Sequence, residues 1–267
     1  MRRLIAFSVG DDTLVGTLDT AEGQTGLLIV SGGDEIRSGA HRGMAMLADS
    51  IAEAGFPVFR FDRRGIGDST GENTGYGSSV EDIAAALNAF RSEASEVTRI
   101  VGFGLCDAAT ALAMFGAEIG IDAFILANPF VEAGDDDLPP ASAIRARYAE
   151  KLREPKSVGR LLTGGVSFGK LRRGLGSILS SHAQDLADDF AAALDEANRP
   201  TTIILTRGDA TAIAFETALS TPAFASIRDR ARIIRIAGHS HSFARPSEAE
   251  ALTAAIITAL EKAGQRA

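Results

Sequence analysis

The sequence contains little of several things that would point to particular classes of protein. It has one cysteine, no tryptophan and four histidines among 267 residues. A single cysteine excludes an intrachain disulfide and a zinc site built from cysteines. No apolar run approaches the roughly 20 residues of a membrane-spanning helix, and residues 1–10 become polar too soon for a signal peptide. We therefore expect a cytoplasmic protein.

Basic charge and cofactor motifs are lacking as well. Acidic residues outnumber basic ones by 35 to 27, and the net charge of −8 argues against general nucleic-acid binding. The chain has no dinucleotide fingerprint, no phosphate-cradling glycine loop and no histidine pair at His-x-x-x-His spacing. We therefore expect no cofactor and no metal.

What the chain does have is a hydrophobic content of 45%, ample for a buried core, and a length that suits one α/β domain. An alternating hairpin comes first. Continuous apolar runs, typical of strands buried on both faces, then alternate with helical patterns. The expected strands are 4–9, 13–18, 26–30, 57–61, 99–103, 123–127, 201–206 and 231–236. About eight such strands predict a mostly parallel, doubly wound sheet.

One interval interrupts this alternation. Residues 134–199 separate two strands by far more than a normal crossover, which predicts a helical cap insertion between core segments 1–133 and 200–267. Within it, residues 145–173 hold nine basic and two acidic residues. This charge is either a solvated helix surface or a surface for an anionic substrate or partner, such as a phosphopantetheine thioester, an acidic glycan or a lipid headgroup.

The single cysteine follows a predicted strand and precedes a predicted helix. Gly104 and Ala108 lie two positions before and after Cys106. This small-x-nucleophile-x-small spacing suits a side chain held out at the apex of a sharp turn, the nucleophile elbow. Free N–H groups at the start of the following helix favour a thiolate and a developing oxyanion. A lone cysteine is usually a small core residue, but its position here predicts a nucleophile.

A thiol nucleophile needs a base, and the base needs an orienting acid. Asp209 and His241 each follow a predicted strand, so they lie at the same edge of the sheet as Cys106. His239 is a second candidate for the base. His241 is favoured, because in the common Gly-x-x-His form of this loop the base is the last residue. Asp209 is also in a position to form a simple turn, and Glu216 is the weaker alternative for the acid.

Backbone amides for an oxyanion are expected at two places. The first is the N–H of Asp107, directly after the nucleophile. The second should come from the glycine loop after strand 26–30, where Gly33 or Asp34 is the expected donor. Gly32 in the same loop would let the backbone approach the substrate.

Two arginines and one further turn complete the set of motifs. Arg37 and Arg42 either bind a substrate carboxylate or phosphate, or pair with the acidic residues 34 and 35 of their own loop. The turn over residues 61–69 we interpret as structural, with Asp62 making local hydrogen bonds, and as adding nothing to the chemistry.

These motifs together resemble a bacterial group, the exosortase A system-associated hydrolases of the first type. The matching segments are Ser31-Gly32-Gly33 with the loop 37–42, residues 62–69, residues 104–109 and His241-Ser242-Phe243. The likeness covers nearly the whole chain. It implies an α/β-hydrolase fold and an association with exopolysaccharide production and C-terminal protein sorting, without naming a substrate. Dienelactone hydrolase is also similar in using a cysteine elbow, but its compact architecture does not suggest so long an insertion.

The predicted function is hydrolysis of an ester, thioester or lactone through Cys106, His241, Asp209 and an acyl-enzyme intermediate. The substrate would be a small molecule or a carrier-bound acyl group. An acyltransferase with the same triad and a non-catalytic binding protein on a hydrolase scaffold are the alternatives. The sequence does not indicate the oligomeric state.

Overall fold

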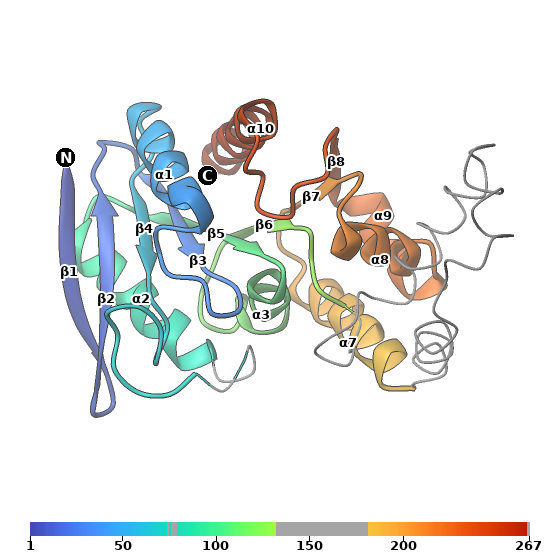
Figure 1. The fold of residues 1–267 in the computed structure, drawn as a ribbon, viewed down its shortest axis with the longest axis horizontal. Helices are drawn as coiled ribbons and strands as arrows, with labels where there is room; N and C mark the ends of the chain where they lie inside the picture. Colours follow the sequence, from blue (N-terminus) through green and yellow to red (C-terminus); the bar gives the residue numbers. More distant parts are fainter. Residues whose placement is uncertain (74, 76–78, 132–180, 266–267) are drawn as a thin grey trace, which may run out of the picture.

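The computed structural model describes residues 1–73, 75, 79–131 and 181–265. They form one eight-stranded sheet with helices on both faces (Figure 1). The strands are β1 (Arg2–Val9), β2 (Asp12–Asp19), β3 (Thr25–Val30), β4 (Val58–Phe61), β5 (Arg99–Leu105), β6 (Ala123–Ala127), β7 (Thr201–Thr206) and β8 (Arg232–Ile236). Strands β3 to β8 run parallel, whereas β2 pairs antiparallel with both β1 and β4. The predicted mostly parallel sheet of about eight strands is confirmed.

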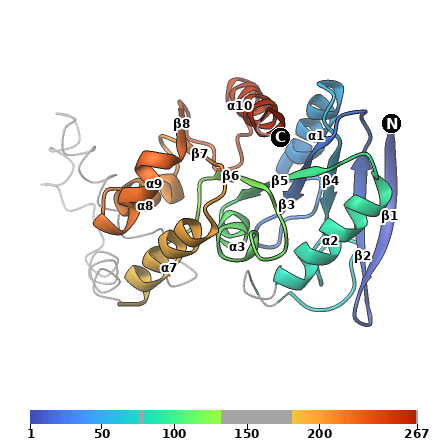
Figure 2. The ribbon, with the colours of Figure 1, turned by 180° about the vertical axis from the view of Figure 1, so that it is seen from behind.

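Helices cover the two faces of the sheet separately, as the front and back views show (Figures 1 and 2). One face carries α1 (Gly43–Glu53) and α10 (Pro246–Gly264), and the other carries α2 (Ser79–Glu93), α3 (Asp107–Phe115) and α7 (Ser181–Ala197). The shorter elements are α8 (Ala210–Leu219), α9 (Ala225–Arg230), η1 (Ala40–Arg42) and η4 (Pro222–Phe224). None of the helices in the described part of the chain combines the length and hydropathy needed to cross a membrane.

The continuous apolar runs have a direct structural cause. In β3, Leu27 and Ile29 pack under α1 and α10, whereas Leu28 and Val30 pack on the opposite side. Successive side chains of a strand point to opposite faces, so a strand covered on both sides must be apolar at every position. All six residues of β3 are buried.

The sheet order β1-β2-β4-β3-β5-β6-β7-β8 reverses direction at β3. The chain passes from β3 to β4 on one side and then returns to β5 on the other. In open parallel sheets, ligands bind at the carboxyl ends of the strands beside such a reversal. The loops after β3 and β5 are therefore placed to build a site together.

The predicted cap falls largely outside the described residues, since residues 134–180, including the basic stretch 145–173, are among those not described. The remaining part belongs to α7. Phe190 and Leu194 of α7 are buried in the hydrophobic cluster below the sheet, and the Phe190 ring packs on Phe215 and Phe224. α7 therefore belongs to the layer of helices that covers the same face of the sheet as α2 and α3. The division into a core and a cap stays a prediction.

Candidate active site

Cys106 occupies a strained turn between β5 and α3. Its φ of 61° and ψ of −123° lie in a region that residues with a side chain rarely adopt. Gly104 lets this turn close, because a Cβ there would lie 2.6 Å from the backbone carbonyl carbon of Ala108. Ala108 itself is fully buried, so a larger residue there would have to displace its neighbours. The strand–turn–helix geometry predicted for the elbow is thus present, with Cys106 partly exposed at its apex.

Asp209 and His241 meet between the loops that follow β7 and β8. The Oδ1 atom of Asp209 lies 3.0 Å from Nδ1 of His241. The other oxygen, Oδ2, accepts the N–H of Ala212 at 2.9 Å, so Asp209 also caps the start of α8. Because the Asp209 side chain is only 7% exposed and bonded on both oxygens, it holds the imidazole in one orientation.

The imidazole of His241 also lies close enough to Cys106 to interact with its side chain. Burial of the ring opposes its positive charge, but the hydrogen bonds to Asp209 and Cys106 and the charges of both outweigh burial. Together they raise the pKa of His241 from 6.5 to about 10. The three predicted catalytic side chains therefore form one connected group.

His241 is expected to stay protonated well above neutral pH. A titration of the imidazole carbon and nitrogen chemical shifts by NMR, assigned with His241→Gln, should place its midpoint near pH 10. Asp209→Asn should lower this pKa more than Cys106→Ala, because Asp209 makes the stronger of the two hydrogen bonds. Since the folded-state pKa is raised, the resulting stabilisation is complete below pH 6.5 and is lost as the pH rises through about 10. A wild-type midpoint near 6.5 would contradict this arrangement.

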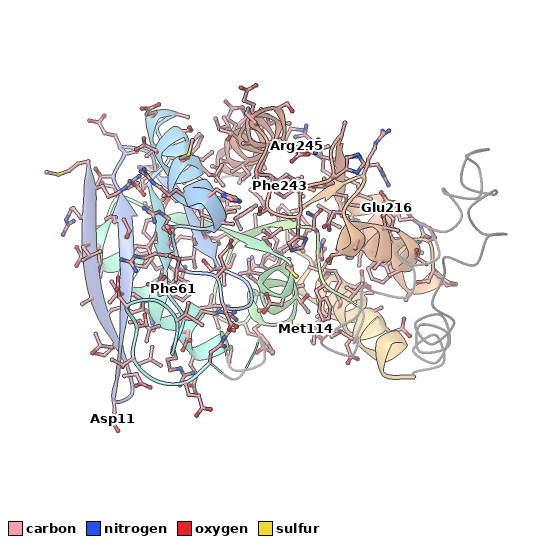
Figure 3. All side chains as sticks on the ribbon, in the orientation of Figure 1. Asp11, Phe61, Met114, Glu216, Phe243 and Arg245 are labelled. Atoms are coloured by element: carbon pink, nitrogen blue, oxygen red, sulfur yellow. The ribbon has the colours of Figure 1, made fainter. Side chains whose placement is uncertain are left out.

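Other titratable residues near the site are arranged differently. His239 is exposed, its ring lies against Gly208, and its backbone N–H donates to the buried carboxylate of Glu248 at 3.0 Å. Glu216, labelled in Figure 3, forms a surface ion pair with Arg235 at 2.6 Å. Among these candidates, His241 and Asp209 are the pair that the structure brings into contact. Within the described ranges, no group of three or more His, Cys, Asp or Glu residues is arranged to hold a metal ion.

Gly32 brings the loop after β3 directly against the elbow. A Cβ at this position would lie 2.4 Å from Oδ1 of Asp107 and 2.6 Å from the carbonyl oxygen of Leu105. The next residue, Gly33, has a φ of 51° and turns the chain, and the N–H of Glu35 closes the turn on the Gly32 carbonyl at 3.0 Å. The glycine loop therefore lies beside the nucleophile, as predicted, and only glycine permits this approach at position 32.

One of the predicted oxyanion donors is already bonded in this structure. The N–H of Gly33 donates to Oδ1 of Asp107 at 2.7 Å. By contrast, the backbone N–H groups of Asp107 and Asp34 have no hydrogen-bond partner within the described part of the chain. Of the three predicted donors, Asp107 and Asp34 thus have free amides in this structure, whereas the amide of Gly33 is held by the Asp107 carboxylate.

Arg63 holds this arrangement together, contrary to the expectation that its turn serves only the fold. Its side chain is 2% exposed, donates to the carbonyl of Gly33, and lies 3.6 Å from Oδ2 of Asp107. A further hydrogen bond of 2.6 Å joins it to Oγ of Ser79. The sequence showed a conventional turn here, because the partners of Arg63 lie on the loop after β3 and on α3, far away along the chain.

Arg37 and Arg42 line a surface hollow to which Cys106 does not contribute. Arg37 forms ion pairs with Asp62 and with Asp68, the latter at 2.9 Å, rather than with the acidic residues of its own loop. Asp62 is fully buried and also accepts the backbone N–H of Arg37, which confirms its structural role. Arg42 is exposed. Neither arginine is brought to the nucleophile.

Asn128 is a residue of the site that sequence reasoning missed. It is fully buried, lies at a φ of 40°, and follows β6 at the same edge of the sheet. Its Oδ1 accepts the N–H of Thr206 at 2.8 Å, and its Nδ2 donates to the carbonyl of His241 at 3.1 Å. Asn128 therefore ties the histidine loop to the neighbouring strands. The feature of the sequence that could have identified Asn128 is that a polar residue directly follows a buried strand.

Replacing Asn128 should slow the reaction more than it weakens substrate binding. Asn128→Ala leaves the Thr206 N–H and the His241 carbonyl without this partner, which costs about 1–3 kcal/mol for each buried group. Asn128→Asp keeps the acceptor for the Thr206 N–H and loses the Nδ2 donor, which serves the His241 carbonyl and, at 3.3 Å, Oγ1 of Thr206. Because the Thr206 hydroxyl can itself donate to a carboxylate, the variant mainly removes the contact with the histidine loop. We expect kcat to fall about tenfold in Asn128→Asp with little change in KM. An altered KM with an unchanged kcat would place Asn128 in substrate binding instead.

Comparison with known proteins agrees with this architecture. Residues 27–255 match the model of a family described as the alpha/beta hydrolase family. None of the curated proteins matches the sequence. Among solved structures, an esterase from Pyrococcus furiosus superposes with a TM-score of 0.65 at 14% identity, over 98% of this chain and 91% of its own.

Two further structures have the same fold. Dienelactone hydrolase from Anabaena variabilis has a TM-score of 0.63 and 16% identity over 98% of this chain and 97% of its own. Est1E from Butyrivibrio proteoclasticus, solved with bound ferulic acid, has a TM-score of 0.61 and 17% identity over 97% and 98%. At such identities the likeness concerns the fold, whereas the family model spans most of the sequence. The chain belongs to the alpha/beta hydrolase family.

Proposed function

We propose that the protein hydrolyses an ester, thioester or lactone through an acyl-enzyme intermediate on Cys106. The observation that carries this proposal is the connected group of Cys106, His241 and Asp209, with 3.0 Å between His241 Nδ1 and Asp209 Oδ1. An imidazole held between a carboxylate and a nucleophile on a strained turn is the arrangement that acyl transfer requires.

In the first half of the reaction, the Cys106 thiolate attacks the carbonyl carbon of the substrate. The negative charge that develops on the carbonyl oxygen is received by the backbone N–H of Asp107 and by that of Asp34, or of Gly33 once Asp107 releases it. The imidazolium of His241 then gives its proton to the departing alkoxide or thiolate, and the acyl group remains on sulfur.

In the second half, His241, now neutral, takes a proton from water as the water oxygen attacks the acyl carbon. Collapse of the tetrahedral intermediate expels the Cys106 thiolate and releases the carboxylic acid. Asp209 remains ionised throughout and stabilises the imidazolium each time it forms. The cycle therefore needs no group outside the chain except water.

A carrier-bound acyl thioester is the substrate class that we favour. Exchange of one thiolate for another is nearly balanced, so a cysteine nucleophile suits a thioester. The likeness of the Ser31-Gly32-Gly33 loop and the cysteine elbow to the exosortase-associated hydrolases supports a role in bacterial exopolysaccharide production and protein sorting. The basic stretch 145–173, which lies outside the described residues, would suit a phosphorylated carrier.

The test is a burst assay followed by intact-mass measurement. Purified enzyme meets p-nitrophenyl acetate and a panel of short acyl thioesters, beside Cys106→Ala as the matched control. We expect an added acyl mass on the wild type that decays with turnover, and none on Cys106→Ala. An adduct that persists until an alcohol, sugar or amine is supplied would identify an acyltransferase with the same triad.

Failure of every substrate to acylate Cys106 would overturn the proposal. That result would favour a non-catalytic binding protein on a hydrolase scaffold, for which salt-sensitive binding to a partner is expected. The connected triad argues for catalysis, because a binding protein has no need of an imidazole with a raised pKa beside a thiol.

A further inference from the structure

A second concave surface lies over the strands at the edge of the sheet. The hollow has a volume of about 540 Å³ and its walls include Arg2, Leu4, Ile36, Arg37, Arg42 and Arg60. Figure 1 shows β1 and β2 at the outer edge of the sheet, beyond α1. None of the residues that line it belongs to the group formed by Cys106, Asp209 and His241.

The strand register explains how the hollow forms. Leu4 lies opposite Thr17, and Thr17 lies opposite Arg60, so these three side chains project from the same face of neighbouring strands. Arg60 is paired in turn with Ile29 of β3, which packs against α1. α1 lies over β4 and β2, and the part of this face nearer β1 remains open beside the helix.

Arginines are the most numerous charged residues of the lining. Arg2, Arg37, Arg42 and Arg60 lie beside Asp62 and Asp68 in the hollow, and two further aspartates, Asp19 and Asp49, pair with Arg2. Arg37 pairs with both of these aspartates, and Asp68 is 69% exposed, so the outer pair is a weak surface contact. The guanidinium of Arg42 has no hydrogen bond or ion pair to any residue that the structure describes. It therefore remains available to a ligand.

Arg60 lies among several other charged side chains. Its side chain is 4% exposed and meets Asp19, itself shared with Arg2, at 3.4 Å. Burial lowers the pKa of Arg60, and the nearby charges of Arg2 and Arg37 lower it further, although Asp19 opposes the effect. An anion in the hollow would relieve this repulsion.

The hollow also has an apolar side. Leu4 is 70% exposed and Ile36 is 46% exposed, and both line it. A single exposed leucine is ordinary on a protein surface, but two large aliphatic side chains on the wall of an arginine-lined hollow complement a ligand that is charged at one end and apolar at the other.

We propose that this hollow binds a small organic anion in which a phosphate or carboxylate group carries a short apolar chain. The oxyanion group pairs with Arg42 and with the accessible edges of the neighbouring guanidiniums, which bind such groups in a planar, bidentate manner. The apolar chain lies over Leu4 and Ile36. This site is separate from the catalytic group, so it does not depend on the function proposed above.

Titration calorimetry with hexyl phosphate, hexanoate, inorganic phosphate and hexyltrimethylammonium tests this proposal. Hexyl phosphate or hexanoate is expected to bind more tightly than inorganic phosphate, and the cation is expected not to bind. Arg42→Gln should weaken binding of the anions about tenfold, and Leu4→Gln should remove the advantage of the hexyl chain. Both side chains are exposed, so the variants are expected to fold.

Arg232→Gln is the matched control, since Arg232 is exposed on β8 at the opposite edge of the sheet. It should bind as the wild type does. A parallel arm uses vesicles with and without phosphatidic acid. Binding of vesicles that is sensitive to Arg42→Gln assigns the oxyanion to a lipid headgroup, and binding of soluble hexyl phosphate assigns it to a free metabolite. Equal loss in Arg42→Gln and Arg232→Gln, or no binding of any anion, would overturn the proposal.

Discussion

Replacing Cys106 by alanine is expected to lower kcat by on the order of 10⁵-fold, because comparable triad enzymes lose about this much without their nucleophile. The alanine side chain cannot form the acyl-enzyme, so only the backbone donors and substrate binding remain to assist water. The loss should appear in steady-state turnover of any ester or thioester that acylates the wild type. No burst of product and no acyl adduct should be observed.

Cys106→Ser is the control that separates chemistry from folding. Serine is similar in size to cysteine, and the small residues on either side are unchanged, so the elbow should close as before. The serine hydroxyl can still hydrogen-bond to His241 but lacks the charge of the cysteine side chain that helps to raise the pKa of His241. We expect measurable but strongly reduced activity, with cooperative thermal unfolding in both variants. Full activity in Cys106→Ala would show that another residue is the nucleophile.

The second large effect is expected from Gly32→Ala. The added Cβ would lie 2.4 Å from the Asp107 carboxylate and 2.6 Å from the Leu105 carbonyl, and the Leu105 carbonyl, a backbone group, cannot retreat without moving the elbow. The loop should therefore shift away from Cys106, and its amides would no longer be aimed at the oxyanion. Loss of one such donor costs about 10²–10³-fold in kcat, so we expect kcat to fall at least 10²-fold.

Two other glycines of the same region provide matched controls for Gly32→Ala. A Cβ at Gly43, the first residue of α1, meets nothing within 4 Å, and its φ of −57° is ordinary for alanine. Gly43→Ala should leave both activity and stability unchanged. Gly33→Ala adds no clash but forces alanine to a φ of 51°, which costs about 1–2 kcal/mol. If Gly32→Ala retained wild-type kcat, the loop would not take part in the reaction.

The contact between Asp107 and the glycine loop links both experiments. The Asp107 carboxylate holds the Gly33 amide, and Arg63 lies against both the carboxylate and the Gly33 carbonyl. Because Arg63 is buried and contacts both groups, it fixes the glycine loop beside the elbow. The side chain of Asp107 thus positions the glycine loop, and its backbone N–H remains free for the oxyanion of the proposed reaction.

Local patterns predicted the elements that carry the site. The elbow was readable because small residues flank Cys106, and Asp209 and His241 were readable because each directly follows an apolar strand. In a parallel sheet the carboxyl ends of the strands lie at one edge, so residues that directly follow different strands are expected to lie close together. The same logic extends to Asn128, which also follows a strand, but an asparagine in a loop has many uses and its partners were not evident.

The ion-pair partners of Arg37 could not be predicted from its neighbours in the sequence. Its neighbours in sequence offered Asp34 and Glu35 as partners, yet its guanidinium pairs with Asp62 and Asp68 from the loop after β4. Long side chains reach whichever carboxylate the fold brings near, and the fold packs the loops after β3 and β4 together. Arg37 and Arg42 consequently line the hollow over β1, β2 and β4 and not the catalytic group.

The sequence by itself determined the fold and singled out the candidate catalytic side chains, because hydrophobic periodicity and turn chemistry are local properties that act wherever the strands end. Only the tertiary structure decided which of two histidines meets Asp209, that Asp107 occupies the Gly33 amide, and that Arg63 and Asn128 support the site. These contacts join side chains from loops far apart along the chain. Their distances depend on how the helices and strands pack, and no local pattern encodes them.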